Sequence, residues 1–418
     1  MKKAIFFIII LSLFSCKTTR IHKRMVKKLN TSFYNNQFTG VLVYNPRTKD
    51  TIVSYNANKY FTPASNTKIF TLFTALTILG DSVPAFKYQI DNDTITLLGT
   101  GNPTFLHPYF KDSSALKLAK KYKKVKIILD NYTDDAYGSG WAWEDYEAYF
   151  SPERTSFPIY GNVLTVSNID TLQITPSILK NELHLTESKY RRHQYKNEFY
   201  YHPNRKKKTE IPMLMDSLLQ LKLWKNLLPN VEFIDNEPKK PFRTFYGIKT
   251  DSVYKRMMHL SDNSLAEQIL IMASSTLSDT LSSTKMSEYM LKNHLQFLKH
   301  KPRWVDGSGL SRYNLFTPTS FVQVLEKLQQ DIPRKRLFNL FPAAGESGTL
   351  KKWYQGNPQP YIYAKSGTLS NNYSLSGYLI TNKGETLLFS FMNNHYREST
   401  SKIKKEMQVF FEYLRDEY

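Results

Sequence analysis

Segments with the character of β-strands lie near both ends of this 418-residue chain, and a long stretch of different character separates them. Residues 40–44 and 51–55 are rich in β-branched and aromatic side chains, and Asn45-Pro46-Arg47 between them is typical of a turn, so they predict a hairpin. Three further strands are predicted near the C-terminus, over residues 361–364, 374–381 and 386–392. The five strands fit one antiparallel sheet, provided that the chain between them is an excursion from it.

Two helices are suited to cover this sheet. Residues 64–79 follow Pro63 and carry apolar side chains around their whole circumference, which predicts a helix buried on most sides. The last helix, residues 401–414, has one apolar face, formed by Ile403, Met407, Phe410, Phe411 and Leu414. Further helices are predicted near residues 264–274 and 287–298. We therefore expect an α/β (α+β) fold in which an antiparallel sheet of about five strands is flanked by helices.

The middle of the chain, residues 83–242, is interpreted as inserted domain material. It combines short alternating strands, such as residues 94–98 and 125–129, with aromatic clusters and basic runs. We expect residues 29–82 and 243–418 to form one domain and the insert to be mainly β. With 41% hydrophobic residues, the chain has enough apolar side chains for two or three cores.

The first sixteen residues determine the compartment that we predict. A short basic start is followed by an uncharged run over residues 4–15, which is too short to span a membrane and is typical of a signal-peptide core. Cys16, the single cysteine, directly follows this run and resembles the lipidated residue of a bacterial lipoprotein signal. We therefore predict a signal peptide over residues 1–15, a lipid anchor on Cys16 and a polar tether over residues 16–28. An ordinary secretory signal or an uncleaved anchor is the alternative.

The chain is strongly basic, with 57 Lys and Arg against 36 Asp and Glu. The formal net charge of +21 becomes +19 when residues 1–15, with two lysines and no acid, are removed. Such a charge suits nucleic acid, an acidic envelope polymer or an anionic membrane surface. Export argues against nucleic acid and predicts a cell-envelope protein, a periplasmic-side or outer-membrane lipoprotein. A basic cluster in the insert is interpreted as a solvated face, with contact to wall polymer or lipid headgroups as the alternative; it comprises Arg191, Arg192 and residues 205–208.

The chemistry of this chain is expected to come from its own side chains. One cysteine cannot supply a disulfide or a cysteine-rich zinc site, and the nine histidines show no His-Glu-x-x-His pattern, so we expect neither a metal nor another cofactor. Ser65-Asn66-Thr67-Lys68 begins the first helix. A spacing of three places Ser65 and Lys68 on one face, one turn apart, so that the amine can take the hydroxyl proton. A helix N-terminus also favours a developing oxyanion.

The pattern Ser-x-x-Lys is weak by itself, because it occurs seven times in the chain, starting at Ser65, Ser114, Ser177, Ser252, Ser282, Ser399 and Ser401. The context of Ser65 distinguishes it from the other six. Pro63 precedes it, the most apolar helix of the chain follows it, and Lys68 would be costly to bury without a role. Ser65 is therefore the candidate nucleophile.

Two more motifs follow. Ser261-Asp262-Asn263 leads into an apolar helix, where Ser261 taken alone would be interpreted as an N-cap. Lys365-Ser366-Gly367-Thr368 is expected at the end of a strand; its glycine allows a ligand close to the backbone, and its lysine and hydroxyls suit a carboxylate. The plain alternative for the last motif is an exposed lysine followed by a turn.

Ser-x-x-Lys, Ser-x-Asn and Lys-[Ser/Thr]-Gly in this order are the signature of penicillin-binding proteins and serine β-lactamases. From about residue 39 to residue 395, the chain resembles the D-alanyl-D-alanine carboxypeptidase/endopeptidase family, the low-molecular-mass class C penicillin-binding proteins. The segments that narrow the resemblance are residues 141–162, 261–267, 306–312 and 348–350. The chain departs from the family in having Ser366 where Thr is usual and in the short separation of 192 residues between Lys68 and Ser261.

The resemblance implies a β-lactamase/transpeptidase-like fold and a serine-type carboxypeptidase that needs no cofactor. Its partners would be peptidoglycan peptides ending in D-Ala-D-Ala and β-lactam antibiotics. The penultimate D-Ala would acylate Ser65, with Lys68 as general base and Ser261 as the proton relay to the leaving amine. Water would then hydrolyse the acyl-enzyme.

The resemblance also implies the substrate-binding residues. Asn263 would hold the amide of the acyl peptide, and Lys365, Ser366 and Thr368 would bind the terminal carboxylate of the substrate. Gly367 completes this motif, and the N–H groups of Ser65 and Thr368 would form the oxyanion hole.

Two other functions stay open at this point. A β-lactamase shares all three motifs but needs a fast deacylating base, commonly a glutamate between the second and third motifs, and no segment there resembles one. Slow penicillin turnover is therefore expected. A catalytically inactive wall-binding lipoprotein of the same fold is the other alternative. The motifs do not distinguish carboxypeptidase from endopeptidase action, because the two differ only in what leaves the same carbonyl.

Overall fold

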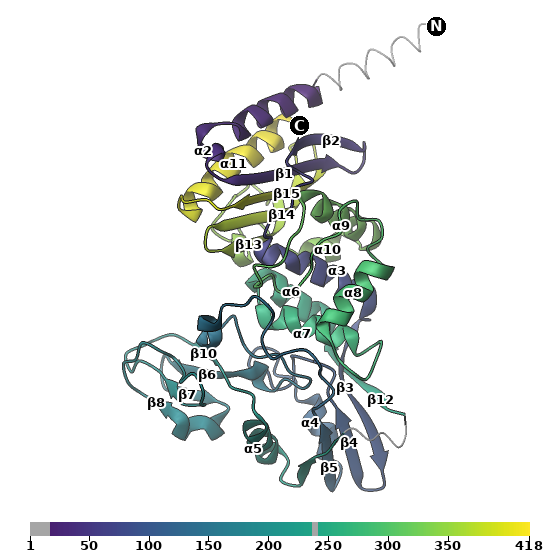
Figure 1. The fold of residues 1–418 in the computed structure, drawn as a ribbon, viewed down its shortest axis with the longest axis vertical. Coiled ribbons are helices and arrows are strands. Elements are labelled where there is room, and N and C mark those ends of the chain that lie inside the picture. The colour runs from purple at the N-terminus through teal and green to yellow at the C-terminus, as the bar shows by residue number, and fades with distance from the viewer. Residues whose placement is uncertain (1–16, 236–240) are drawn as a thin grey trace.

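The computed structural model describes residues 17–235 and 241–418. Figure 1 shows an elongated molecule in which the two end regions of the chain form the upper part and the middle of the chain forms the lower part. The strands are β1 (Phe38–Asn45), β2 (Asp50–Tyr55), β3 (Ser82–Asp91), β4 (Thr94–Leu98), β5 (Lys124–Ile128), β6 (Val163–Asn168), β7 (Leu172–Thr175), β8 (Leu183–His184), β9 (Phe199–Tyr200), β10 (Thr209–Pro212), β11 (Val231–Phe233), β12 (Arg243–Lys249), β13 (Ile362–Leu369), β14 (Asn372–Ile380) and β15 (Thr386–Asn394). The helices are α2 (Ser32–Asn35), α3 (Lys68–Ile78), α4 (Ser114–Ala119), α5 (Ser217–Leu227), α6 (Thr250–Leu260), α7 (Asn263–Ser274), α8 (Ser283–Asn293), α9 (Pro318–Asp331), α10 (Arg334–Leu340) and α11 (Thr400–Glu417).

The upper part is built on one antiparallel sheet with the strand order β13-β14-β15-β1-β2. The N-terminal hairpin and the three C-terminal strands therefore join as predicted, with β1 beside β15 although most of the chain lies between them. Side chains alternate between two hydrophobic cores, as strand geometry requires. Val41 and Val43 of β1 belong to one core, whereas Leu42 and Tyr44 pack against the other.

Helices cover both faces of this sheet. On one face α9 packs against β15 and β1, and α3, α6, α7, α8 and α10 contribute to the same core. On the other face lies α11, whose apolar residues are buried as its sequence pattern predicts. Within residues 17–235 and 241–418, no helix has the length and apolar character needed to cross a membrane.

Residues 17–28, which we expected to form a polar tether, are helical instead. Ile21, Met25 and Leu29 recur every four residues and are buried in the core that α11 covers. The helix and α11 lie side by side in Figure 1, and Lys28 Nζ is 2.9 Å from Glu406 Oε2 of α11. This apolar stripe makes the segment part of the folded domain. The predicted signal peptide and Cys16 lie outside the described residues.

The lower part has its own sheets and core. One sheet has the order β11-β5-β4-β3-β12, a second has the order β10-β6-β7, and β8 pairs with β9. Their apolar side chains, together with those of α4 and α5, form a third hydrophobic cluster. The insert is thus mainly β, as expected. Strand β12, which we had placed in the other domain, pairs with β3, so residues 243–249 extend the sheet of the insert.

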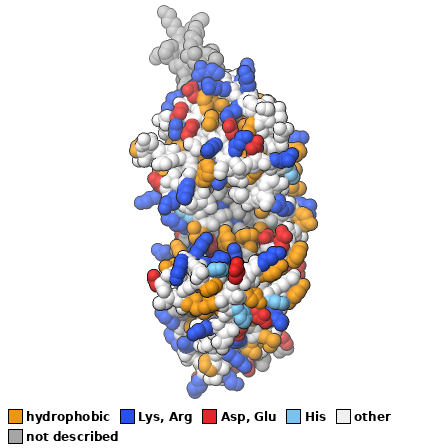
Figure 2. Space-filling model, turned by 90° about the vertical axis from the view of Figure 1, so that its left-hand side faces the viewer, with side chains coloured by type: hydrophobic (Ala, Val, Ile, Leu, Met, Phe, Trp, Pro, Cys, Tyr) orange, Lys and Arg blue, Asp and Glu red, His pale blue; other side chains and the backbone are white. Residues whose placement is uncertain are grey.

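The basic cluster of the insert is only partly a solvated face. Arg192 is fully buried, and its guanidinium donates to the backbone carbonyls of His193 and Gln194 at 2.9 and 3.2 Å. Its role is therefore structural, which corrects our interpretation of this residue. Residues 206–208 are exposed as expected. Figure 2 shows Lys and Arg side chains along one whole face of the molecule.

Candidate active site

The first motif occupies the entry into α3. Residues Ala64–Thr67 form a 3₁₀ turn, and α3 begins at Lys68. Ala64 has a φ of +49°, a left-handed conformation that a residue with a side chain adopts only when the surrounding structure imposes it. Ser65 is partly exposed and Lys68 is fully buried, with Lys68 Nζ 3.0 Å from Ser65 Oγ. The spacing of three residues thus brings the amine within hydrogen-bond distance of the hydroxyl.

The Lys68 side chain is held at its end by three hydrogen bonds. Besides Ser65 Oγ, its Nζ contacts Asn263 Oδ1 and the carbonyl oxygen of Ser308, each at 2.7 Å. Thr71, one turn further along α3, donates to the adjacent carbonyl of Gly307 at 2.6 Å. The amine is therefore fixed in place by groups from α7 and from the segment around Ser308.

Burial sets the protonation of Lys68. Desolvation lowers the pKa of Lys68 from its ordinary value to about 8, and three carboxylates oppose this effect, those of Asp306, Glu267 and Asp262. A lysine with a pKa near 8 is neutral in roughly a tenth of the molecules at pH 7. This group is therefore able to accept a proton under ordinary conditions, as a general base must.

The second motif connects α6 to α7. Ser261 ends α6 in the left-handed region, with φ 56° and ψ 38°, and Asp262 is the N-cap of α7, accepting from the Leu265 N–H at 3.1 Å. The N-cap role that the sequence offered for Ser261 thus belongs to Asp262. Asn263 begins α7, and besides its contact with Lys68 its Nδ2 donates to the Phe150 carbonyl of the insert at 3.0 Å.

The third motif lies within β13 instead of after its end, because this strand is longer than predicted. Lys365 is fully buried, and its Nζ donates to Ser261 Oγ at 2.9 Å and to the Ser366 carbonyl at 2.7 Å. Burial, and then the charge of Lys68, lower the pKa of Lys365 well below its ordinary value. The alternative of an exposed lysine is thereby excluded.

Gly367 is required by the close approach of β13 to the serine turn. A Cβ at this position would lie 2.5 Å from the Pro63 carbonyl oxygen and 2.9 Å from the backbone nitrogens of Ser65 and Asn66. Such contacts are too short for any real side chain. The sequence suggested that this glycine admits a ligand, whereas in the structure it admits the backbone of the first motif.

The three motifs, more than 100 residues apart in the chain, therefore converge on one place. A comparison with protein families matches residues 26–184 and 251–414 to the D-Ala-D-Ala carboxypeptidase 3 (S13) family. These ranges cover more than half of the chain and contain all three motifs. The chain belongs to the D-Ala-D-Ala carboxypeptidase 3 (S13) family. Residues 185–250 lie between the two matched ranges and comprise part of the insert, β12 and the first residue of α6.

Curated relatives of this S13 chain match it over shorter stretches. The D-alanyl-D-alanine carboxypeptidase DacB of Haemophilus influenzae is 31% identical over 168 residues, which are 38% of this chain and 35% of the relative. The D-alanyl-D-alanine carboxypeptidase of Actinomadura sp. is 39% identical over 95 residues, 21% of this chain and 18% of the relative. The chain thus matches about a third or less of the length of these relatives.

Solved structures resemble the S13 chain over nearly its whole length. Penicillin binding protein 4 (dacB) from Haemophilus influenzae has a TM-score of 0.73 at 19% identity, covering 94% of this chain and 99% of that one. A predatory endopeptidase from Bdellovibrio bacteriovorus has a TM-score of 0.51 at 14% identity, covering 90% and 93%. At these identities the likeness shows that the fold is shared.

The motifs of this S13 chain border a cleft of about 1290 Å³ between the upper and lower parts. Figure 2 shows this face hollowed at mid-height. Ser65, Ser261 and Asn263 line the cleft from one side, and Ser366 and Thr368 line it from β13. The Ser366 hydroxyl is also 2.7 Å from Thr349 Oγ1, which the sequence associated with the family without giving it a role.

The insert contributes to the same cleft, which we did not predict. Trp141, Glu144, Asp145 and Tyr149 line it, opposite the three motifs. The aromatic cluster over residues 141–149 was the available signal, but a pattern in sequence does not indicate which surface a loop will face. The insert is therefore a wall of the cleft as well as a separate core.

Within the described residues, no group of three or more His, Cys, Asp or Glu side chains is arranged to hold a metal ion. Cys16, the predicted lipidation site, lies outside these residues. Ser65 and Ser261 line the cleft, and the buried Lys68 and Lys365 lie behind them, each in contact with one of the two hydroxyls.

Proposed function

We propose that this protein is a serine-type D-Ala-D-Ala carboxypeptidase that acts on peptidoglycan stem peptides through an acyl-enzyme on Ser65. The observation that carries the proposal is the linked pair of contacts in the cleft, Ser65 with Lys68 and Ser261 with Lys365. Each hydroxyl has an amine within 3.0 Å. Such pairs supply the proton transfers of acyl transfer without a histidine or a metal.

Acylation uses the first pair. Ser65 Oγ attacks the carbonyl carbon of the penultimate D-Ala while neutral Lys68 takes the hydroxyl proton. The N–H groups of Ser65 and Thr368 stabilise the oxyanion of the tetrahedral intermediate. The C–N bond then breaks, and the amine of the terminal D-Ala leaves with the proton that Lys68 took from Ser65, passed on through Ser261, so that Lys68 is neutral again. Water attacks the ester carbonyl while Lys68 accepts its proton. The C–O bond to Ser65 then breaks, Lys68 returns the proton to Ser65 Oγ, and the shortened peptide leaves with a new carboxylate.

Substrate binding uses the third motif. Lys365 is buried beside hydroxyl groups and another lysine, so a carboxylate entering the cleft would supply its counter-charge. The hydroxyls of Ser366 and Thr368 border the cleft at the same strand and would donate to that carboxylate. Asn263 Nδ2 would hold the amide of the acyl peptide. Penicillin binding protein 4 (dacB) from Haemophilus influenzae, which has a similar fold, has been solved in complex with a β-lactam, which supports β-lactam binding here.

The first test is labelling with a fluorescent penicillin, followed by D-Ala release from a stem pentapeptide. Wild type should take the label and release D-Ala, and Ser65→Ala should do neither. Ser177→Ala is the matched control, because Ser177 begins another Ser-x-x-Lys pattern and is exposed on the insert; it should behave as wild type. An unlabelled wild type, or equal labelling of Ser65→Ala, would contradict the assignment.

Endopeptidase action differs from carboxypeptidase action in the group that leaves the acyl carbon. β-Lactamase action differs from penicillin binding in the rate of deacylation. Digestion of purified cross-linked and uncross-linked muropeptides measures endopeptidase against carboxypeptidase action. Release of hydrolysed penicillin from the labelled enzyme measures β-lactamase action, which we expect to be slow because the sequence offers no segment resembling a dedicated deacylating base.

We further propose that the protein is exported and anchored through a lipid on Cys16. The support is the uncharged run before this cysteine and its position as the first residue after a predicted signal peptide. Metabolic labelling with a fatty acid should modify wild type and not Cys16→Ser, and the variant should leave the membrane fraction. A membrane-bound, unlabelled wild type would indicate an uncleaved anchor instead.

A further inference from the structure

The groups around Lys68 are themselves held by one segment of the insert, residues 134–156. The carboxylates of Asp306, Glu267 and Asp262 lie close enough to raise the pKa of Lys68, and Lys365 is close enough for the charge of Lys68 to lower the pKa of Lys365. Two of these carboxylates, and the Asn263 amide that accepts from Lys68, have partners in this segment. The segment belongs to the insert, yet its contacts reach the first neighbours of the proposed general base.

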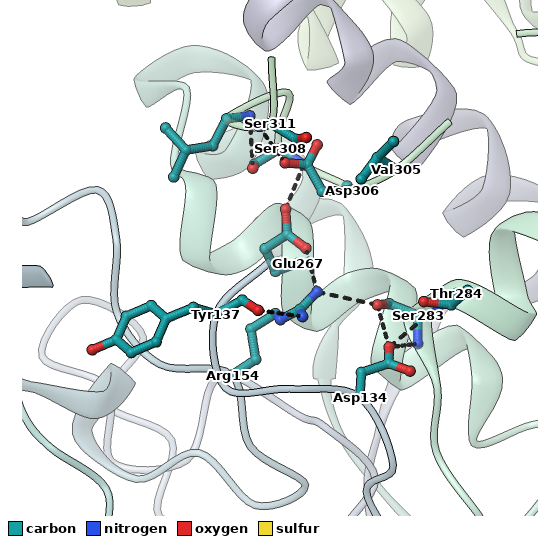
Figure 3. A network of polar contacts seen from close by, with 12 residues as sticks. Asp134, Tyr137, Arg154, Glu267, Ser283, Thr284, Val305, Asp306, Ser308 and Ser311 are labelled. Carbon is teal, nitrogen blue, oxygen red and sulfur yellow. Dashed lines mark hydrogen bonds and ion pairs between the residues drawn. The ribbon is translucent and has the colours of Figure 1, made fainter. Parts of the chain in front are cut away.

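Arg154 provides the first connection between residues 134–156 and Lys68 (Figure 3). Arg154 Nη1 is 3.4 Å from Glu267 Oε2, and the side chains are only 7% and 1% exposed. The other oxygen of Glu267 accepts from the Ser308 N–H at 2.8 Å, and the Ser308 carbonyl accepts from Lys68. Glu267 lies four residues after Asn263, so both point from the same face of α7. One buried ion pair thus fixes the backbone that holds the amine.

The second connection runs through Trp141 and Phe150. Trp141 Nε1 donates to Asp306 Oδ2 at 2.9 Å, and Asp306 in turn accepts from the N–H groups of Gly309 and Ser311. The carbonyl of Phe150 accepts from Asn263 Nδ2 at 3.0 Å, which leaves Asn263 Oδ1 directed at Lys68. The segment therefore also determines the orientation of this amide.

The segment is anchored independently of these contacts. The carboxylate of Asp134 accepts from the hydroxyls of Ser282 and Ser283, at 2.6 and 2.5 Å, and from backbone N–H groups at the start of α8. Arg154 also donates to the backbone carbonyls of Asp135 and Tyr137. Figure 3 shows Arg154 between this anchor and Glu267. Near the other end, the Thr155 N–H donates to Gln268 Oε1 of α7 at 3.2 Å, so the segment is tied at both ends and can hold Glu267 rigidly.

We propose that residues 134–156 of the insert position Lys68 and fix the negative charge beside it, with Arg154 acting through Glu267 and Trp141 acting through Asp306. These are positioning residues, since none of them touches the reacting atoms. The proposal rests on the proposed role of Lys68 as general base. It gives the insert a part in the reaction beyond forming a wall of the cleft.

The test is the pH dependence of acylation by a fluorescent penicillin. The negative charge of Glu267 raises the pKa of Lys68, and acylation requires neutral Lys68, so Glu267→Gln should move the midpoint of the acid limb to lower pH. We expect a shift of about half a unit to one unit, which is less than a direct ion pair produces. Well below the midpoint this corresponds to roughly three- to tenfold faster acylation relative to the plateau.

Glu153→Gln is the matched control. Glu153 precedes Arg154, is also buried, and directs its carboxylate to the Met215 N–H inside the insert, at 2.9 Å. Its variant should keep the wild-type midpoint, whatever its effect on stability. An equal shift in both variants would show general loosening of the segment and would overturn the proposal.

A second variant tests whether the result of Glu267→Gln comes from loss of the charge or from misfolding. Glu267→Gln leaves Arg154 buried without its counter-charge, whereas exchanging both partners of a buried pair for apolar residues is often neutral for stability. Arg154→Met combined with Glu267→Met should therefore fold and show a shift in the same direction. A wild-type midpoint in either folded variant would refute the role of the pair. Failure of wild type to take any label would instead refute the proposed function itself.

Discussion

Lys68 and Lys365 are both fully buried beside the same cleft, but their surroundings differ. Lys68 has three carboxylates near it, and they oppose the effect of burial on its pKa. The pKa of Lys365 is shifted by burial and by the positive charge of Lys68, and both lower it. Because the carboxylates offset part of the effect of burial, Lys68 keeps a pKa of about 8 and can exchange protons near neutral pH. Within the part of the chain that the structure describes, no carboxylate is among the groups that shift the pKa of Lys365, so an anionic ligand could supply the missing counter-charge. This difference in surroundings supports the two different tasks that we propose for Lys68 and Lys365.

The largest effect on the rate of acylation is expected from removing the amine of Lys68, which contacts Ser65. Lys68→Met should slow penicillin acylation by about 10²- to 10⁴-fold, the usual contribution of a general base. The measurement is the rate of labelling under single-turnover conditions. Lys180→Met, in the exposed Ser177 pattern, is the control and should label as wild type. Unchanged labelling of Lys68→Met would assign the proton transfer to another group.

Removing the amine of Lys365 should weaken the binding of peptides that have a free terminal carboxylate. Lys365→Met should raise KM for a peptide with a free terminal carboxylate by about 10- to 100-fold, as expected for a charge-assisted contact. For the same peptide with a terminal carboxamide, KM should hardly change. The ratio of the two KM values is the measurement. A variant that still discriminates between carboxylate and amide would show that Lys365 does not bind the anion.

The pH dependence separates the two lysines in the wild type. Acylation should rise as the pH increases through about 8, because Lys68 is active when neutral. KM for carboxylate substrates should rise over the pH range in which Lys365, with its lowered pKa, loses its proton. Stopped-flow acylation and steady-state KM, each measured from pH 6 upwards, would show the two trends. Parallel behaviour of both quantities would contradict the division of tasks.

The smallest effect is expected at Ser366. Ser366→Thr keeps the hydroxyl that faces Thr349 and restores the residue usual in the resembling family, so turnover should change by less than about fivefold. Ser366→Ala removes the hydroxyl and should lose more than Ser366→Thr. Steady-state turnover of the stem peptide distinguishes them. Equal activity of both variants would remove Ser366 from the carboxylate site.

The central sheet and the three motifs were predictable because each depends on short-range pattern. Strand alternation placed β1, β2 and the three C-terminal strands, and reactive side chains in a fixed order marked Ser65, Ser261 and Lys365. Helix α9 was not predicted, although Thr317 and Pro318 form a recognisable helix start. The stripe of Ile21, Met25 and Leu29 was obscured by the basic residues between them.

The surroundings of Lys68 could not be predicted in the same way. Arg154 and Glu267 are 113 residues apart, and Trp141 and Asp306 are 165 apart, so nothing in their local sequence indicates a contact. Such contacts depend on how the insert folds back onto the sheet domain. The motifs and their proposed chemistry could therefore be predicted from sequence, whereas the contacts that surround Lys68 require the three-dimensional arrangement.

The helix over residues 17–29 has a consequence for where the enzyme can work. The described part of this helix starts at Lys17 and is packed onto α11, so a lipid on Cys16 would be attached one residue away from the folded body of the protein. An anchor of this kind gives the cleft a narrow range of heights and tilts above the membrane. With the anchor and the carboxypeptidase activity that we propose, the protein would reach only the layer of wall that lies within that range.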